Sequence, residues 1–396
     1  MTGIWLSVWI TLAIQALVSL VVFTPPVLAP AAQAEIGVQA SSVGVVTALI
    51  YLSATFGALL SGRLIARHGP MRTSQGSLVL GGCGIALMAS ANSWLVALGA
   101  LVIGVGYGQV TPSSSAILAE RSPERLRAFI FSLKQTGVPI GGAAAGAMLP
   151  ALIQAFGWRW AALLAGMTCV AFALALQPLR AGIDRGSRVA DHTPAAGLIE
   201  PLRLVLSHAR LREMAFASFT YSGMQMCLGT FLVVFLHDRA GFGLGAAGAA
   251  LSTAMIAGIG GRIFWGVVAD NWLKPRLVLG VLGAGMSLSA FLTAFVTAAW
   301  PATVVFVVSF LYGATGVGWN GVYLSEVARI APAGRAAAAT GAALAITYSG
   351  VMVLPFLFWA IVAVSGSYAA AFIVTGCLTL WRCRPFFGDG SPATAA

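Results

Sequence analysis

Charged side chains are scarce in this sequence. Asp, Glu, Lys and Arg together make up 8% of its 396 residues, whereas hydrophobic residues make up 59%. A soluble domain needs charged residues at about a quarter of its positions to cover its surface. The mean hydropathy of +0.91 reflects the same imbalance. This shortage excludes a soluble globular protein and predicts an integral membrane protein surrounded by the lipid bilayer.

Acidic residues and histidines are missing from the interior of the long apolar runs. The four histidines stand at or beyond the ends of these runs, at His68, His192, His208 and His237. Proton-driven carriers usually need a buried carboxylate or histidine, so this absence disfavours drug export by proton antiport. No Ser/His/Asp arrangement or carboxylate pair is found either, and we therefore do not expect an enzyme.

Cysteine is sparse and shows no informative spacing. The cysteines are odd in number and include no Cys-x-x-Cys or Cys/His pattern: Cys83, Cys169, Cys227, Cys377 and Cys383. This spacing excludes a disulfide framework and gives no sign of a metal site or another cofactor. The N-terminus also lacks a basic region followed by a cleavage site, so we expect the first apolar run to be a membrane span rather than a signal peptide.

Acidic residues are outnumbered by basic ones, which gives a net charge of +11. The excess follows the topology, because 17 of the 22 Lys and Arg fall in one alternating set of connections: Arg67, Arg72, Arg121, Arg125, Arg127, Arg180, Arg185, Arg188, Arg203, Arg210, Arg212, Lys274, Arg276, Arg329, Arg335, Arg382 and Arg384. The opposite set holds only Arg159 and Arg239. This asymmetry predicts both termini in the cytoplasm and a place in the cytoplasmic (inner) membrane. It also removes the reason to expect nucleic-acid binding.

Long apolar runs dominate the rest of the sequence and predict an all-α protein with twelve transmembrane helices. We place them at residues 5–28, 41–66, 74–92, 94–118, 128–155, 159–178, 213–236, 246–269, 277–298, 301–325, 338–363 and 367–381. Residues 179–212 are polar and predict a cytoplasmic linker, part of which (198–211) has the pattern of an amphipathic helix on the membrane surface. The predicted domains are therefore 1–178, the linker 179–212, 213–381 and a cytoplasmic tail, 382–396.

The two halves repeat each other at a nearly constant offset. It is 204 to 206 residues for four pairs: Gly62 and Gly266, Arg72 and Arg276, Glu120 and Glu326, and Pro150 and Pro355. An internal repeat of half the chain length indicates two copies of one six-helix unit.

Twelve spans in a 6+6 duplication, with a GxxxDRxGxxR-like loop at 62–72, resemble the major facilitator superfamily. The resemblance implies a central cavity, alternating access and a loop that latches the halves on the cytoplasmic side. Arg67 and Gly69 match the loop motif, but Ala66 stands where the family has an acid. The second copy keeps Asp270. We expect a cytoplasmic gate that contains Arg67, Gly69 and Asp270.

Two glutamates complete the predicted gate. Glu120 and Glu326 occupy matching cytoplasmic helix ends, near the basic loop residues Arg67 and Lys274. A gate ion pair explains them better than a substrate ligand does.

Arg262 is a cation inside an apolar run. It lies eight residues before Asp270, roughly 12 Å deeper if that residue marks the edge of the membrane. A guanidinium at such a depth costs roughly 2.5–3.5 kcal/mol, which a bound anion offsets. The spacing Arg-x-x-x-Gly-x-x-Ala-Asp resembles segment 8 of monocarboxylate and oxalate/formate-type carriers, which implies that Arg262 holds a substrate carboxylate as a two-pronged donor. The alternative is a pairing with a backbone carbonyl or a polar group of another helix.

Lys134 is the corresponding candidate in the first half, and it either faces the same cavity or pairs with Glu120 at the cytoplasmic end. Uncharged polar residues complete the predicted substrate site: Gln15, Tyr51, Gln109, Gln225, Asn320 and Tyr348. Taken singly, each of these residues fits a hydrogen bond between helices slightly better than it fits a substrate ligand.

These patterns together predict a secondary active or facilitative transporter of a small organic anion, a carboxylate, that works by alternating access. Proton symport, anion exchange and facilitated diffusion stay open, and we expect a monomer. Export of amphipathic drug-like compounds is the alternative function, suggested by the aromatic and Met content. A membrane-embedded enzyme or a sensor is a further alternative that no motif supports.

Overall fold

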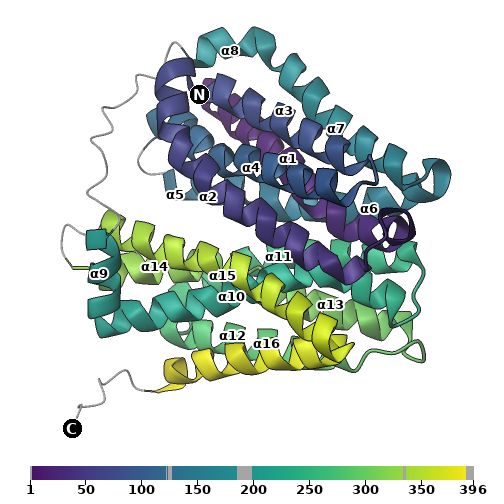
Figure 1. Ribbon diagram of the computed structural model, residues 1–396. Helices are drawn as coiled ribbons and strands as arrows, with labels where there is room; N and C mark the ends of the chain where they lie inside the picture. Colours follow the sequence, from purple (N-terminus) through teal and green to yellow (C-terminus); the bar gives the residue numbers. More distant parts are fainter. Residues whose placement is uncertain (1, 122, 124–126, 185–198, 333–335, 389–396) are drawn as a thin grey trace. The chain divides into compact units, whose positions relative to one another are not determined.

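The computed structural model describes residues 2–121, 123, 127–184, 199–332 and 336–388, and this part of the chain is helical with no strand (Figure 1). The prediction of an all-α membrane protein is confirmed. The chain divides into two compact units, residues 1–192 with 242–252, and residues 193–241 with 253–396. The predicted domain bounds stay predictions.

The first unit is a bundle of long helices with one short helix after it. The helices are α1 (Thr2–Ile36), α2 (Val43–His68), α3 (Pro70–Met88), α4 (Ser93–Arg121), α5 (Arg127–Gln135), α6 (Gly137–Phe156), α7 (Trp158–Ala175) and α8 (Gln177–Asp184). A short 3₁₀ turn, η1 (Ala40–Ser42), leads into α2. Helices α2 and α3 both pack on α4, and α1 packs on α6. Three prolines lie inside α1, at Pro25, Pro26 and Pro30.

The second unit holds the remaining helices. They are α9 (Ile199–Ser207), α10 (Ala209–Asp238), α11 (Leu244–Asn271), which belongs to this unit from Thr253 onward, α12 (Pro275–Ala294), α13 (Ala302–Gly316), α14 (Asn320–Ile330), α15 (Ala336–Ser365) and α16 (Tyr368–Cys383), followed by the 3₁₀ turn η3 (Arg384–Phe387). Helix α10 packs along α15, and its Phe231 ring stacks on Phe358 at 4.1 Å. This apolar contact fixes the helix that carries Gln225.

Each of the twelve predicted spans coincides with a helix or with a broken helix. In the described residues, ten helical stretches are long and apolar enough to cross a membrane. The other two predicted spans correspond to α3, which begins with the polar run Pro70–Gln75, and to α16, which has only 16 residues. Two predicted spans are interrupted well inside their length, one at Thr136 between α5 and α6, the other between α13 and α14, and the span at 159–178 is interrupted near its end, at Leu176 between α7 and α8.

The predicted amphipathic helix at 198–211 is α9, and it ends earlier than expected. His208 has an extended backbone (φ −90°, ψ 111°), after which α10 begins at Ala209. The apolar side of α9 packs against α15 and α10, and Val205 is fully buried there. Residues 185–198 of the predicted linker lie outside the described part of the chain.

Candidate functional site

Arg262 lies on α11, nine residues before this helix ends at Asn271, and its side chain is half-buried. Its Nε donates a hydrogen bond to the carbonyl oxygen of Val317 at 3.1 Å. Val317 is the residue at which α13 ends. The last carbonyl groups of a helix have no partner within the helix, so they are available to a side chain that reaches them.

One face of α11 packs closely against the interruption between α13 and α14, which we call the break. Gly258, Gly261, Arg262 and Trp265 have the spacing i, i+3, i+4 and i+7, which places them on the same side of a helix. A side chain at Gly258 would collide with Val317, and one at Gly261 would collide with the Ala314 carbonyl. The two glycines therefore let α11 approach closely enough for its arginine to reach the end of α13.

Trp265, one turn after Arg262 on α11, also contacts the interruption between α13 and α14. Its Nε1 donates to the carbonyl oxygen of Ala314 at 3.1 Å. A side chain at Gly318 would come within 2.9 Å of the Trp265 ring, so the interruption between α13 and α14 requires a glycine at this position. Arg262 and Trp265 thus both bond carbonyl oxygens around residues 314–317.

Gln225 connects α10 to the start of α14. Its Oε1 accepts hydrogen bonds from Trp319 Nε1 at 3.1 Å and from Asn320 Nδ2 at 3.3 Å. The Trp319 ring is fully buried and makes edge contacts with Tyr221 at 5.7 Å and Tyr323 at 5.3 Å. Three of the predicted substrate residues, Arg262, Gln225 and Asn320, are therefore gathered at one helix break within the second unit.

Lys134 holds the corresponding place in the first unit. It lies in the last turn of α5, just before the interruption at Thr136, and is 2% exposed. Its Nζ donates to Gln135 Oε1 at 3.2 Å and to Thr111 Oγ1 of α4 at 3.5 Å. Both acceptors are neutral. The alternative partner from the sequence, the side chain of Glu120, lies outside the described residues.

Gln15 packs against the start of α6. A side chain at Gly137 would come within 2.8 Å of the Gln15 Cβ, so the glycine allows the contact between α1 and α6. Gln15 is 1% exposed, and its Nε2 donates to Ser19 at 3.4 Å. Its Oε1 is buried without a hydrogen-bond partner among the described residues.

The other predicted substrate residues lie on other helices: Gln109 on α4, Tyr51 on α2 and Tyr348 on α15. Gln109 donates to the Val105 carbonyl of its own helix at 3.0 Å. Tyr51 is buried and meets Tyr107 edge-on, with ring centres 5.6 Å apart. Tyr348 on α15 is 49% exposed. Their assignment as substrate ligands stays a prediction.

The loop between α2 and α3 contacts an acid on α8 that the sequence motif did not reveal. Gly69 has φ +87°, a conformation that favours glycine, and a side chain there would meet the Asp184 carboxyl group at 2.5 Å. Asp184 Oδ1 accepts a hydrogen bond from the Met71 backbone N–H at 2.8 Å, and Arg180 lies 3.8 Å from Oδ2. Helix α8 thus supplies a carboxylate to the start of α3. Only the departure from the motif at Ala66 pointed to this contact.

The remaining predicted gate residues have different surroundings. Glu326 is 5% exposed and accepts two hydrogen bonds from Arg329 of its own helix, at 2.6 and 2.7 Å. The Glu326 carboxylate raises the pKa of the Arg329 guanidinium. Arg67 and Asp270 are exposed. The gate role of these residues and of Glu120 stays a prediction.

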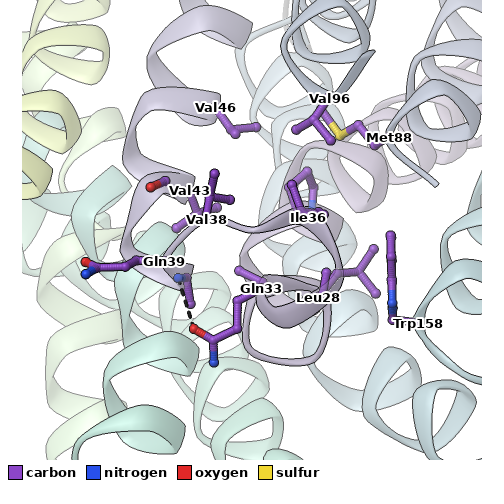
Figure 2. A pocket seen from close by; sticks show the side chains of 15 residues that line it. Leu28, Gln33, Ile36, Val38, Gln39, Val43, Val46, Met88, Val96 and Trp158 are labelled. Atoms are coloured by element: carbon purple, nitrogen blue, oxygen red, sulfur yellow. Dashed lines mark hydrogen bonds between the residues drawn. The ribbon is translucent and has the colours of Figure 1, made fainter. Parts of the chain in front are cut away.

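A small apolar cavity in the first unit is a second place for a ligand, but its lining does not suit an anion. It has a volume of about 70 Å³ and lies between the end of α1, the start of α2 and the neighbouring ends of α3, α4 and α7 (Figure 2). Leu28, Val43 and Met88 are among the side chains that line it. Gln33 is engaged, since its Oε1 accepts from the Ala40 backbone N–H and its Nε2 donates to the Pro30 carbonyl.

The sequence is similar to transporters of organic acids. It is 26% identical to the gentisate transporter of Corynebacterium glutamicum over 366 residues, which is 87% of this chain and 78% of that protein. It is 31% identical to the 4-hydroxybenzoate transporter PcaK of Pseudomonas putida, over 38% of this chain and 34% of that protein. The probable sulfoacetate transporter SauU of Cupriavidus necator is 25% identical, over 89% of this chain and 86% of its own length.

Solved structures share the fold. A POT family transporter in complex with a thioalcohol-conjugated peptide superimposes with a TM-score of 0.75 at 13% identity, over 96% of this chain and 94% of that one. The Escherichia coli fucose:proton symporter FucP gives a TM-score of 0.61 at 17% identity, over 96% and 98% of the two chains. The model of the Major Facilitator Superfamily matches residues 11–355, nearly the whole sequence. The chain therefore belongs to the major facilitator superfamily of membrane transporters.

Proposed function

We propose that this protein carries a small organic carboxylate across the cytoplasmic membrane by alternating access, and that Arg262 binds the carboxylate. The observation that carries the proposal is the placement of Arg262, a half-buried cation on an apolar helix whose Nε bonds a neutral carbonyl oxygen. A bound carboxylate would offset the cost of burying a guanidinium in an apolar helix, and it matches the planar guanidinium with two parallel hydrogen bonds.

The relatives favour an aromatic carboxylate. Gentisate and 4-hydroxybenzoate, which name two of them, are benzoic acids that carry hydroxyl groups. Trp265 lies one turn after Arg262 on α11 and is half-buried, so the surroundings of Arg262 include a large apolar ring that suits a benzene ring. The drug-export alternative gains no support, because the similar proteins are named for organic acids.

The finer points of the proposal come from the sequence. The distribution of Lys and Arg supports a carrier with both termini in the cytoplasm. We also propose that it acts as a monomer, because each unit forms its own compact core. Flux measured with and without a pH gradient, and with and without substrate on the far side, distinguishes proton symport, exchange and facilitated diffusion.

Reconstituted protein tests the proposal directly. Liposomes that contain the wild type should accumulate labelled benzoate or 4-hydroxybenzoate but not the neutral benzamide. We expect Arg262→Ala to abolish this uptake. Arg63→Ala is the matched control, since Arg63 is an exposed arginine on α2 outside the proposed site. Equal uptake by the two variants would refute the assignment of Arg262, and uptake of benzamide at the same rate would refute selection for anions.

A further inference from the structure

The hydrogen bonds of Gln225 fix which way its side-chain amide points. Trp319 Nε1 is a donor only, so the Gln225 atom that faces it at 3.1 Å has to be the acceptor, Oε1. The same oxygen lies 3.3 Å from the Asn320 side chain. Asn320 therefore has to present its donor, Nδ2, toward Gln225. The oxygen and nitrogen of a side-chain amide are hard to tell apart by position alone. Here the indole N–H of Trp319 fixes the orientation of both amides, because it can only donate.

This arrangement determines what the two amides still offer. Gln225 retains its Nε2 group, a double donor, and Asn320 retains its Oδ1, an acceptor. Within the described residues, the hydrogen bonds of this side-chain pair are the two to Gln225 Oε1. Both residues are only half-buried, so a ligand can reach these atoms. A donor beside an acceptor suits a hydroxyl group, which accepts and donates at the same oxygen.

The break brings this pair and the arginine into one neighbourhood. Arg262 bonds Val317, and Asn320 follows three residues later. Consecutive Cα atoms are about 3.8 Å apart, so Val317 and Asn320 lie within roughly 11 Å of each other. One aromatic ring with a carboxylate and a hydroxyl on different carbons spans a separation of this order.

We propose that Gln225 and Asn320 bind a hydroxyl group on the substrate whose carboxylate Arg262 holds, so that the transporter selects hydroxylated aromatic carboxylates over plain ones. This inference rests on the proposed function. It assigns selectivity to the amide pair and anion binding to the arginine. If the pair only maintained the shape of the break, removing either amide would instead weaken the binding of all substrates equally.

A binding series on the purified full-length protein separates these roles. The ligands are benzoate, the 2-, 3- and 4-hydroxybenzoates and the three corresponding fluorobenzoates. Fluorine is close to a hydroxyl in size but cannot donate a hydrogen bond. We expect wild type to bind the best hydroxybenzoate at least about tenfold more tightly than its fluoro analogue, which corresponds to one or two hydrogen bonds.

Two variants of the pair test its role. Asn320→Ala removes the acceptor and leaves the bond between Gln225 and Trp319, so we expect the tenfold ratio to fall toward one while the affinity for benzoate stays within a factor of about two. Gln225→Met removes the donor and should lower the ratio as well. It also removes the partner of Trp319, so Asn320→Ala decides the matter if Gln225→Met does not fold.

The arginine variant distinguishes the two proposals. Arg262→Lys should weaken the binding of every carboxylate ligand. It should leave unchanged the ratio of the affinities for the hydroxy ligand and the fluoro ligand. If Arg262→Lys behaves in this way but the wild-type ratio is near one, or Asn320→Ala weakens benzoate and hydroxybenzoate alike, the hydroxyl assignment is overturned while the carboxylate assignment stands. If Arg262→Lys leaves all affinities intact, or no carboxylate binds the wild type, the proposed function fails and the inference fails with it.

Discussion

Each unit holds one cation next to an interrupted helix, but the two cations are placed in different ways. Lys134 belongs to the interrupted helix itself, is almost fully buried and bonds two neutral side-chain oxygens. Arg262 belongs to a continuous helix, is half-buried and reaches a backbone carbonyl at an interruption in another helix. An ammonium is a compact point charge, whereas a guanidinium is a planar fork that recognises geometry.

The difference suggests a division of labour. Arg262 is held at Nε, and its guanidinium is a planar donor group suited to orient a carboxylate. Lys134 is suited to supply positive charge without setting an orientation. Variants that keep the charge and change its shape therefore sharpen the comparison most.

The largest effect is expected for a change of shape at constant charge. Arg262→Lys loses one of two charged hydrogen bonds to the carboxylate, about 1.5–3 kcal/mol, so the Kd for benzoate should rise by about 10- to 100-fold. Lys134→Arg should change the Kd by a smaller factor and act mainly through the stability of its tightly packed site. Isothermal titration of both variants tests the comparison. Equal losses of affinity would show that both cations orient the substrate.

The break in the second unit is expected to be the next most sensitive feature. Gly318→Ala places a methyl group against the Trp265 ring and the Ala314 carbonyl, an overpacking that typically costs about 1–3 kcal/mol. We expect a lower unfolding temperature and slower uptake. Gly321→Ala is the matched control three residues later, because a side chain there meets nothing within 4 Å. If Gly318→Ala matched this control in both measurements, the break would not need its close contact with α11.

The sequence could predict most of the fold and only part of the site. Apolar length alone located all twelve spans, and a charge inside such a span singled out Arg262. The interruptions were not predictable, because hydrophobicity continues through them. Residues 316–318 read Gly-Val-Gly inside an apolar run, and glycines are as common in intact membrane helices. At the interruption, side chains of α11 bond the carbonyl oxygens of Ala314 and Val317, and these contacts come from a distant part of the sequence.

Contacts between residues that are far apart in the sequence could not be predicted either. Gln225 and Asn320 were both candidates, but 95 residues separate them, and only the folded chain shows that they share a bond. Asp184 was not a candidate at all, since 113 residues separate it from Met71. A polar residue in an apolar run indicates that a partner exists without indicating which one. Transport rather than catalysis, by contrast, was predicted from the duplicated twelve-span pattern and the lack of a catalytic motif, and the family confirms it.

The loops after α2 and α11 extend the comparison, and the effect expected there is smaller. Asp184 caps the start of α3 in the first unit, whereas Asp270 is exposed in the second. Asp184→Ala removes a helix cap, which typically costs about 0.5–2 kcal/mol, so we expect a modest fall in unfolding temperature. Asp270→Ala, the control, should leave it unchanged. Equal falls would mean that the cap contributes nothing specific to the first unit.

The smallest effect is expected at the partner of Lys134. Thr111→Val keeps the shape of the side chain and removes one of the two oxygens that accept from Nζ, and Gln135 remains as the other. Because the bond to Thr111 is long at 3.5 Å, we expect a loss at the low end for a hydrogen bond, about 0.5 kcal/mol, in unfolding free energy. A charge that only contributes potential tolerates a small displacement, so the Kd for benzoate should stay within a factor of about two. A tenfold loss of affinity for benzoate in Thr111→Val, at unchanged stability, would show that Lys134 needs an orientation as strict as that of Arg262. The proposed difference between the roles of Lys134 and Arg262 would then be wrong.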